Sequence, residues 1–68
     1  MEVTEERNNG EIIQRGLEDF KNIQQHMLIA KEENAVKTYA SLKRDYLTLK
    51  ALLNSMGVNL IEIDYIKE

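Results

Sequence analysis

The sequence predicts an all-α fold, an antiparallel helical hairpin that assembles as a dimeric helical bundle. Three observations predict it. The composition has no Pro and few Gly. Apolar residues in two long segments recur at alternating spacings of three and four, which place them on one face of a helix. The chain has only 68 residues, and a domain of that size buries only about 60% of the surface that its unfolded form exposes.

Small domains compensate for a limited core with disulfides, metals or oligomerisation. The chain has no Cys and one His, which excludes disulfides, thiolate metal sites and His-rich metal sites. We therefore expect no cofactor and no metal, and we expect a homo-oligomer, with a dimer favoured. The acidic N-terminus does not resemble a signal peptide, and the longest apolar run is far shorter than the ~20 residues that span a bilayer. We expect a cytoplasmic protein without membrane contact.

The first predicted helix runs from Gly10 to Glu32, within a single domain that covers residues 10–68. Residues 1–9 carry several like charges and little apolar surface, so we expect this segment to be disordered. Gln24 falls on the apolar face of the helix, and Gly16 lies beside it, where a glycine allows close approach of a second backbone. The expected core residues of this helix are Ile13, Leu17, Phe20, Ile23 and Met27.

The regular spacing of apolar residues is interrupted after Met27. Either the chain turns at Lys31–Asn34, or one long helix continues through a stutter. We favour the turn, because this tetrapeptide is wholly polar and Asn34 is a good N-cap for a second helix over residues 35–56. Gly57 follows where a left-handed residue commonly ends a helix. The expected core residues of the second helix are Tyr39, Leu42, Tyr46, Leu49, Leu53 and Met56.

The C-terminal element, residues 60–67, has two interpretations. Asn59 and Glu62 have the spacing of a capping box, which favours a short helix, whereas apolar and acidic residues alternate from Ile61 as in a strand. A strand would need a partner from another chain. We expect this apolar segment to engage a partner or a second copy; alternatively, it folds back and caps the hairpin. The candidate partner-binding residues are Leu60, Ile61, Ile63, Tyr65 and Ile66.

Charge is unevenly distributed, with a net charge of −3 and a basic segment at residues 35–57 between two acidic ones. One interpretation is charge complementarity between neighbouring helices of the same chain. The other is a basic face for nucleic acid, although the chain as a whole is acidic and shows no recognition motif. The candidate nucleic-acid-binding residues are Lys37, Lys43, Arg44 and Lys50.

The sequence shows no constellation that points to catalysis, so we do not expect an enzyme. His26 falls opposite the apolar stripe, where a solvated side chain is the ordinary case. Tyr39 and Tyr46 lie one heptad apart, either as core rings with hydroxyls at the rim or as an exposed pair on a binding face. The prediction is a small regulatory interaction protein, of the kind that phages, mobile elements and bacteria encode, which binds itself and another macromolecule. The alternatives are a nucleic-acid-binding regulator and a small subunit of a larger complex.

Overall fold

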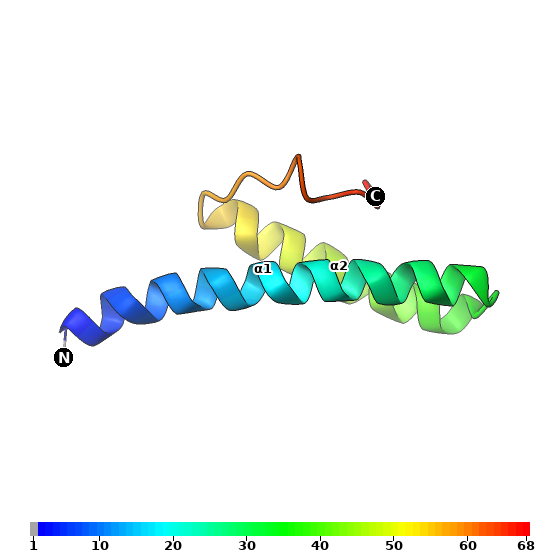
Figure 1. The fold of residues 1–68 in the computed structure, drawn as a ribbon, viewed down its shortest axis with the longest axis horizontal. Helices are drawn as coiled ribbons and strands as arrows, with labels where there is room; N and C mark the ends of the chain where they lie inside the picture. The colour runs from blue at the N-terminus through cyan, green and yellow to red at the C-terminus, as the bar shows by residue number, and fades with distance from the viewer. Residues whose placement is uncertain (1) are drawn as a thin grey trace.

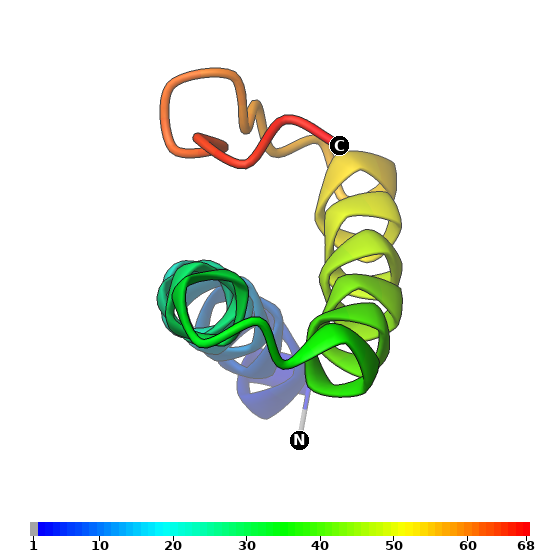
Figure 2. The same ribbon diagram turned by 90° about the vertical axis from the view of Figure 1, so that its right-hand side faces the viewer.

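The computed structural model describes the backbone of residues 2–68 and the side chains of residues 10–68. Over this range the chain forms two α-helices, α1 (Glu2–Glu32) and α2 (Val36–Ser55), which pack together as a hairpin. Residues 57–59, the joint, lead into residues 60–68, the tail, which runs back over the hairpin (Figure 1). Seen end-on, α1, α2 and the tail lie at the three corners of a triangle (Figure 2). The described residues contain no strand, and the predicted all-α hairpin is confirmed.

A pair of stacked aromatic rings lies at the centre of the core. The rings of Phe20 on α1 and Tyr46 on α2 have centroids 5.3 Å apart and planes inclined by 16°, and both side chains are fully buried. Burying one large apolar side chain stabilises a fold by about 1.5–3 kcal/mol, so this interface is a main source of stability. Of the expected core residues, Phe20, Met27, Tyr46 and Leu53 are fully buried, and Ile13, Leu17, Ile23, Tyr39, Leu42, Leu49 and Met56 are half-buried.

Gly16 allows α1 to pack closely against Leu53 of α2. A Cβ atom at this position would lie 2.9 Å from Leu53 Cδ2, which is closer than side chains normally approach. Gly10, by contrast, has no neighbouring atom within 4 Å of the position that a Cβ would take. Gly16 therefore serves helix packing, which offsets the ~1 kcal/mol that glycine costs inside a helix relative to alanine.

The predicted turn at Lys31–Asn34 is confirmed, but Asn34 does not act as the N-cap of the second helix. Asn34 has a φ of 57° and ends α1: its N–H donates to the Lys31 carbonyl at 3.1 Å, and the Ala35 N–H donates to the Ala30 carbonyl at 2.8 Å. These two bonds form a Schellman motif, which asparagine tolerates better than most residues. A residue in this left-handed conformation cannot also take the extended conformation of an N-cap. Ala35 is the N-cap instead, without a side-chain hydrogen bond.

The end of α2 agrees with expectation. Gly57 has a φ of 86°, its N–H donates to the Asn54 carbonyl at 3.0 Å, and the Val58 N–H donates to the Leu53 carbonyl at 3.0 Å. This is a second Schellman motif, with Val58 packed against the core as its apolar contact. Gly57 thus reverses the chain and sends the tail back along the hairpin.

The tail has neither of its predicted forms, a short helix or a strand. It makes one turn, in which the N–H groups of Ile63 and Asp64 donate to the Leu60 carbonyl at 3.1 and 2.9 Å, and then runs on irregularly. The expected capping box is absent, because Asn59 Oδ1 accepts from the Ile61 N–H at 3.0 Å and thereby closes an Asx-turn. The main chain beyond this turn bonds to helix side chains, which removes the need for regular structure.

The first helix begins at Glu2, well before the expected start at Gly10. The segment contains no Pro, so every residue in it can continue a helix. The first turns of α1 consequently extend past the end of α2 (Figure 1). The side chains of residues 1–9 lie outside the described part of the chain, and the disorder expected for this segment stays a prediction.

Candidate binding groove

The side chain of Gln24 holds the tail by its main chain. Gln24 lies on the core face of α1 and is fully buried. Its Nε2 donates to the Ile63 carbonyl at 2.9 Å, while its Oε1 accepts from the N–H groups of Tyr65 at 2.9 Å and Ile66 at 3.0 Å. One amide thus satisfies three main-chain groups of an irregular segment, as a neighbouring strand would. The surface of α1 and α2 that the tail covers, which we call the groove, therefore holds a non-helical segment of the same chain.

Asp64 anchors the middle of the tail in a polar cluster. The Tyr46 hydroxyl donates to Asp64 Oδ1 at 2.6 Å, the Lys67 N–H donates to the same oxygen at 2.9 Å, and Lys50 Nζ lies 2.8 Å from Oδ2. The Tyr46 hydroxyl also accepts from the Glu68 N–H at 3.1 Å. Asp64 is only 6% exposed, and its partners satisfy both carboxylate oxygens. The bonds to the Asp64 carboxylate are charge-assisted, and such hydrogen bonds are stronger than those between two neutral groups.

The protonation states in this cluster follow from its contacts. Burial raises the pKa of Asp64, but the bonds from Lys50, Tyr46 and the Lys67 N–H outweigh it and hold that pKa below its ordinary value. Burial, together with the bond to Asp64, raises the pKa of Tyr46. The bond to Asp64 also raises the pKa of Lys50. At neutral pH the cluster therefore contains an ionised carboxylate between a neutral phenol and a charged ammonium.

The end of the tail is held more loosely. Lys43 Nζ lies 2.8 Å from Glu68 Oε1, and Lys50 Nζ donates to the Glu68 carbonyl at 3.1 Å. Both side chains of the Lys43–Glu68 pair are more than a third exposed, and exposed ion pairs contribute only about 0–1 kcal/mol. Gln24 and Asp64 therefore dominate the polar attachment of the tail.

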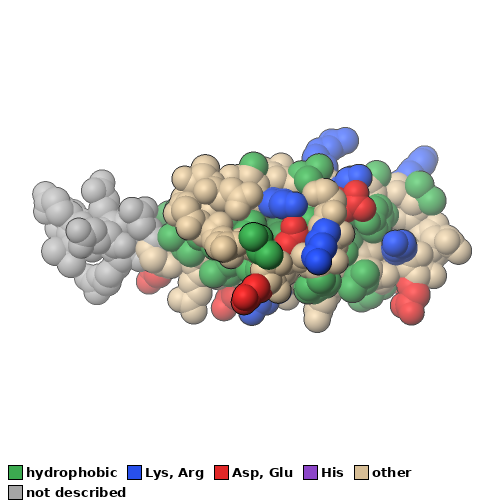
Figure 3. Space-filling view, turned by 90° about the horizontal axis from the view of Figure 1, so that it is seen from above, with side chains coloured by type: hydrophobic (Ala, Val, Ile, Leu, Met, Phe, Trp, Pro, Cys, Tyr) green, Lys and Arg blue, Asp and Glu red, His purple; other side chains and the backbone are tan. Residues whose placement is uncertain are grey.

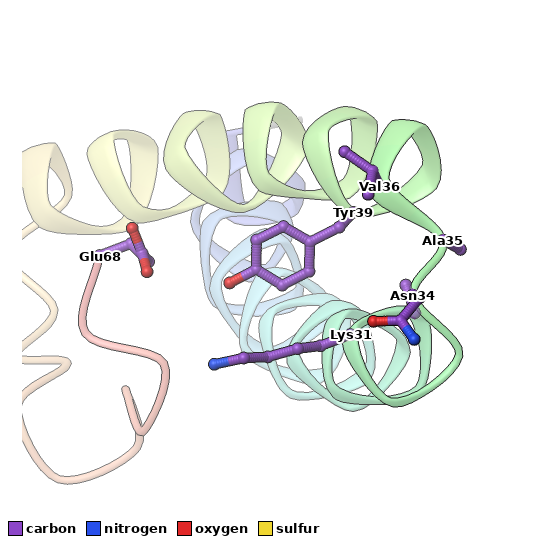
Figure 4. Close-up of a pocket in the computed structure, with 7 residues that line it drawn as sticks. Lys31, Asn34, Ala35, Val36, Tyr39 and Glu68 are labelled. Carbon is purple, nitrogen blue, oxygen red and sulfur yellow. The ribbon is translucent and has the colours of Figure 1, made fainter.

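A hollow of about 380 Å³ lies beside Glu68, toward the turn between the helices (Figure 4). In the close-up, the side chains of Lys31 and Tyr39 both point toward the side on which Glu68 lies. Lys31 contributes to lowering the pKa of Glu68, after the stronger effect of Lys43. The hollow is lined by small apolar side chains together with an amide, a cation, a phenol and a carboxylate. Its lining residues are Ala30, Lys31, Asn34, Ala35, Val36, Tyr39 and Glu68.

The four cations proposed for nucleic acid fall into two pairs. Lys43 and Lys50 are half-buried and bound to tail carboxylates. Lys50 Nζ also lies 5.6 Å from the centroid of the Tyr46 ring. Lys37 and Arg44 are exposed on α2. Two of the four charges thus already have intramolecular partners, and these partners lie on the tail, whereas one interpretation of the sequence expected them on a neighbouring helix.

The candidate partner-binding residues of the tail also divide in two. Leu60 is buried, and Ile63 and Ile66 pack half-buried against the core. Ile61 and Tyr65 point outward, with 77% and 50% of their surfaces exposed. The tail therefore folds back on its own hairpin, but it lies along both helices and leaves two apolar side chains uncovered.

Sequence reasoning missed the roles of Gln24 and Asp64. The available signals were a glutamine at a core position of the heptad and an aspartate inside an apolar segment, since buried polar groups need partners. His26 is exposed. The described residues contain no cluster of three or more metal-binding side chains, and neither described helix is long and apolar enough to cross a membrane.

Apolar side chains are exposed on both helices and on the tail. On the face that carries the tail, hydrophobic side chains lie between charged ones (Figure 3). Within residues 10–68, the large apolar residues with at least 43% of their surface exposed are Ile12, Leu28, Ile29, Val36, Leu47, Leu52, Ile61 and Tyr65. Comparison with models of protein families, with curated proteins and with solved structures found no match.

Proposed function

We propose that this chain is a non-enzymatic, regulatory interaction protein that self-associates and binds another macromolecule. The observation that carries the proposal is the set of exposed large apolar side chains, which range from Leu47 at 43% to Ile61 at 77%. Single exposed apolar residues are ordinary on a protein surface, whereas many of them on a two-helix hairpin indicate an interaction surface. The small core of the hairpin gives association a second role, because burial between copies adds to stability.

Val36 and Ile61 are the most exposed members of this set, at 76% and 77%. Val36 lies at the start of α2, beside the hollow next to Glu68, and Ile61 lies at the start of the tail. Neither side chain belongs to the core, so both can be replaced without opening a cavity. They are therefore the substitutions of choice for separating association from folding.

Sedimentation equilibrium over micromolar concentrations tests self-association. The expected result is a mass above that of the 7.9 kDa chain. The double variant Val36→Ser with Ile61→Ser should keep its helical spectrum and dissociate at higher protein concentration than the parent. The matched control replaces the adjacent exposed residues, Lys37→Ser with Glu62→Ser, and should associate like the parent. A cooperatively folded 7.9 kDa monomer at every concentration would contradict the proposal.

The nucleic-acid alternative is less favoured, because the ion pairs of Lys43 and Lys50 with the tail leave fewer charges for phosphates. Binding through Lys37 and Arg44 alone would depend only weakly on salt. The logarithm of the binding constant falls with the logarithm of the salt concentration with a slope of about −0.9 for each phosphate contacted. Fluorescence anisotropy with a labelled duplex at several salt concentrations measures that slope. Tight binding with a steep slope would overturn this ranking.

A further inference from the structure

The groove holds residues 60–68, and the described residues of the groove make no hydrogen bond to the joint. Its bonds run from Gln24, Lys43, Tyr46 and Lys50 to the stretch between Ile63 and Glu68. The N–H groups of the first two joint residues bond to the end of α2, and the Asn59 side chain bonds within its own turn. The polar contacts of the groove are therefore the same whether a tail arrives from its own chain or from another.

An empty groove would be costly. Gln24 and Tyr46 are both fully buried under the tail, and the described part of the chain leaves none of its buried side-chain polar atoms without a partner. Without the tail, the Gln24 amide loses three main-chain partners and Lys50 loses its carboxylate. A segment that displaces the tail must restore these bonds. It must present main-chain groups to Gln24, a carboxylate to Tyr46 and Lys50, and apolar side chains to the core.

The joint is suited to redirecting the tail. Gly57 has open space around the position of a Cβ and Asn59 is exposed, whereas Val58 packs against the core, so a change in chain direction is least obstructed at Asn59. Ile61 follows the joint and is the most exposed large apolar side chain among the described residues. If two chains crossed at their joints, the two copies of Ile61 would lie near the crossing, where each could bury surface that is now exposed.

We propose that two copies of this chain form a dimer by exchanging tails, so that residues 60–68 of each copy fill the groove of the other. The proposal rests on the self-association proposed above and names its mechanism. An exchanged tail restores every groove contact, so the exchanged dimer and two closed monomers differ only in the joints, in the new contacts near them and in the entropy of association. A short linker gives the chain's own tail an effective concentration in the millimolar range, and contacts such as those of Ile61 must offset this advantage.

Cross-linking between distinguishable chains tests the exchange. The natural chain has no Cys, so single cysteines can be placed at will. One chain carries Lys43→Cys and a ¹⁵N-labelled chain carries Glu68→Cys, at two positions whose side chains are in contact and partly exposed. The chains are unfolded and refolded together, brought to a concentration at which sedimentation shows dimers, and treated with a short bifunctional maleimide. The matched control replaces Lys43→Cys with Arg44→Cys, one residue along α2 on its exposed side.

Mass spectrometry should show a product that joins one light and one heavy chain, several-fold more abundant with Lys43→Cys than with Arg44→Cys. A dimer that yields no such excess refutes tail exchange and leaves self-association standing. The double variant Lys43→Cys with Glu68→Cys, diluted until monomeric, confirms the reach of the reagent by cross-linking within one chain. A chain that sediments as a monomer at every concentration refutes both tail exchange and the proposed self-association.

Discussion

Replacing Gln24 with leucine should release the tail without disrupting the hairpin. Leucine fits a fully buried position on the core face of α1 and keeps the helix propensity of that position high. It cannot, however, donate to the Ile63 carbonyl or accept from the N–H groups of Tyr65 and Ile66. The substitution therefore removes the main-chain attachment of the tail and leaves the core apolar.

The magnitude follows from these three bonds. A main-chain group left without a partner costs about 1–3 kcal/mol when it is buried, and the lower value applies where water can reach it. The three bonds are partly buried, so their loss costs about 1 kcal/mol each, and the greater burial of an apolar side chain offsets about 1 kcal/mol of the total. The net loss is about 2 kcal/mol, a large share of the ~3–5 kcal/mol that a core of this size supplies.

Urea titration followed by circular dichroism measures the change in the free energy of unfolding, and amide hydrogen exchange locates it. The amides of Tyr65 and Ile66 should lose protection first, while amides within α1 and α2 keep theirs. The control is Gln25→Leu at the exposed neighbouring position, which should change stability by less than about 0.5 kcal/mol. If Gln24→Leu were equally neutral and the tail amides stayed protected, the amide of Gln24 would not be what holds the tail.

Gly16→Ala should destabilise the chain by about 1 kcal/mol, because the new Cβ would lie 2.9 Å from Leu53 Cδ2 and the overpacking outweighs the gain in helix propensity. The control, Gly10→Ala, places its Cβ in open space and should be neutral or stabilising in the same urea titration. Phe20→Ala should cost about 3–5 kcal/mol, since the ring is fully buried, and a loss below about 1 kcal/mol in thermal or urea melts would contradict its central place. Folding lowers the pKa of Asp64. The ionised Asp64 carboxylate therefore stabilises the fold above the unfolded pKa of about 3.9, and this stabilisation is lost as the pH falls through the lower folded pKa. Asp64→Asn should therefore flatten the acid dependence of the free energy of unfolding, and a parent and variant with parallel curves below about pH 4 would refute that assignment.

Local patterns in the sequence predicted the two helices and the turn between them. Heptad spacing identified the faces that bury Phe20 and Tyr46, because a helix places residues three and four apart on one side. The glycine at position 57 marked the end of α2 correctly, since few other residues adopt its left-handed conformation. These features depend on residues within one or two helical turns of each other.

The tail could not be predicted in this way. Its attachment to Gln24 joins residues about 40 positions apart. Its own residues combine the capping-box spacing of a helix with the alternation of a strand, so they do not decide between the two. The same limit applies to Asn34, whose preference for helix N-caps was correct as a tendency but yielded to the need to end α1. In both cases, tertiary contacts or neighbouring elements decided between conformations that local propensity left open.

Among the residues that the structure describes, the tail makes no main-chain-to-main-chain hydrogen bond with either helix, and this affects the order of folding. A helical hairpin with a short turn forms through contacts close in sequence, and such contacts form early and fast. The tail can complete its bonds to the hairpin only after Gln24 from α1 and Tyr46 from α2 have been brought together, so its attachment cannot precede the hairpin. It should therefore behave as a separate unit of lower stability that opens locally while both helices stay intact. Residues 60–68 thus acquire their structure last and lose it first.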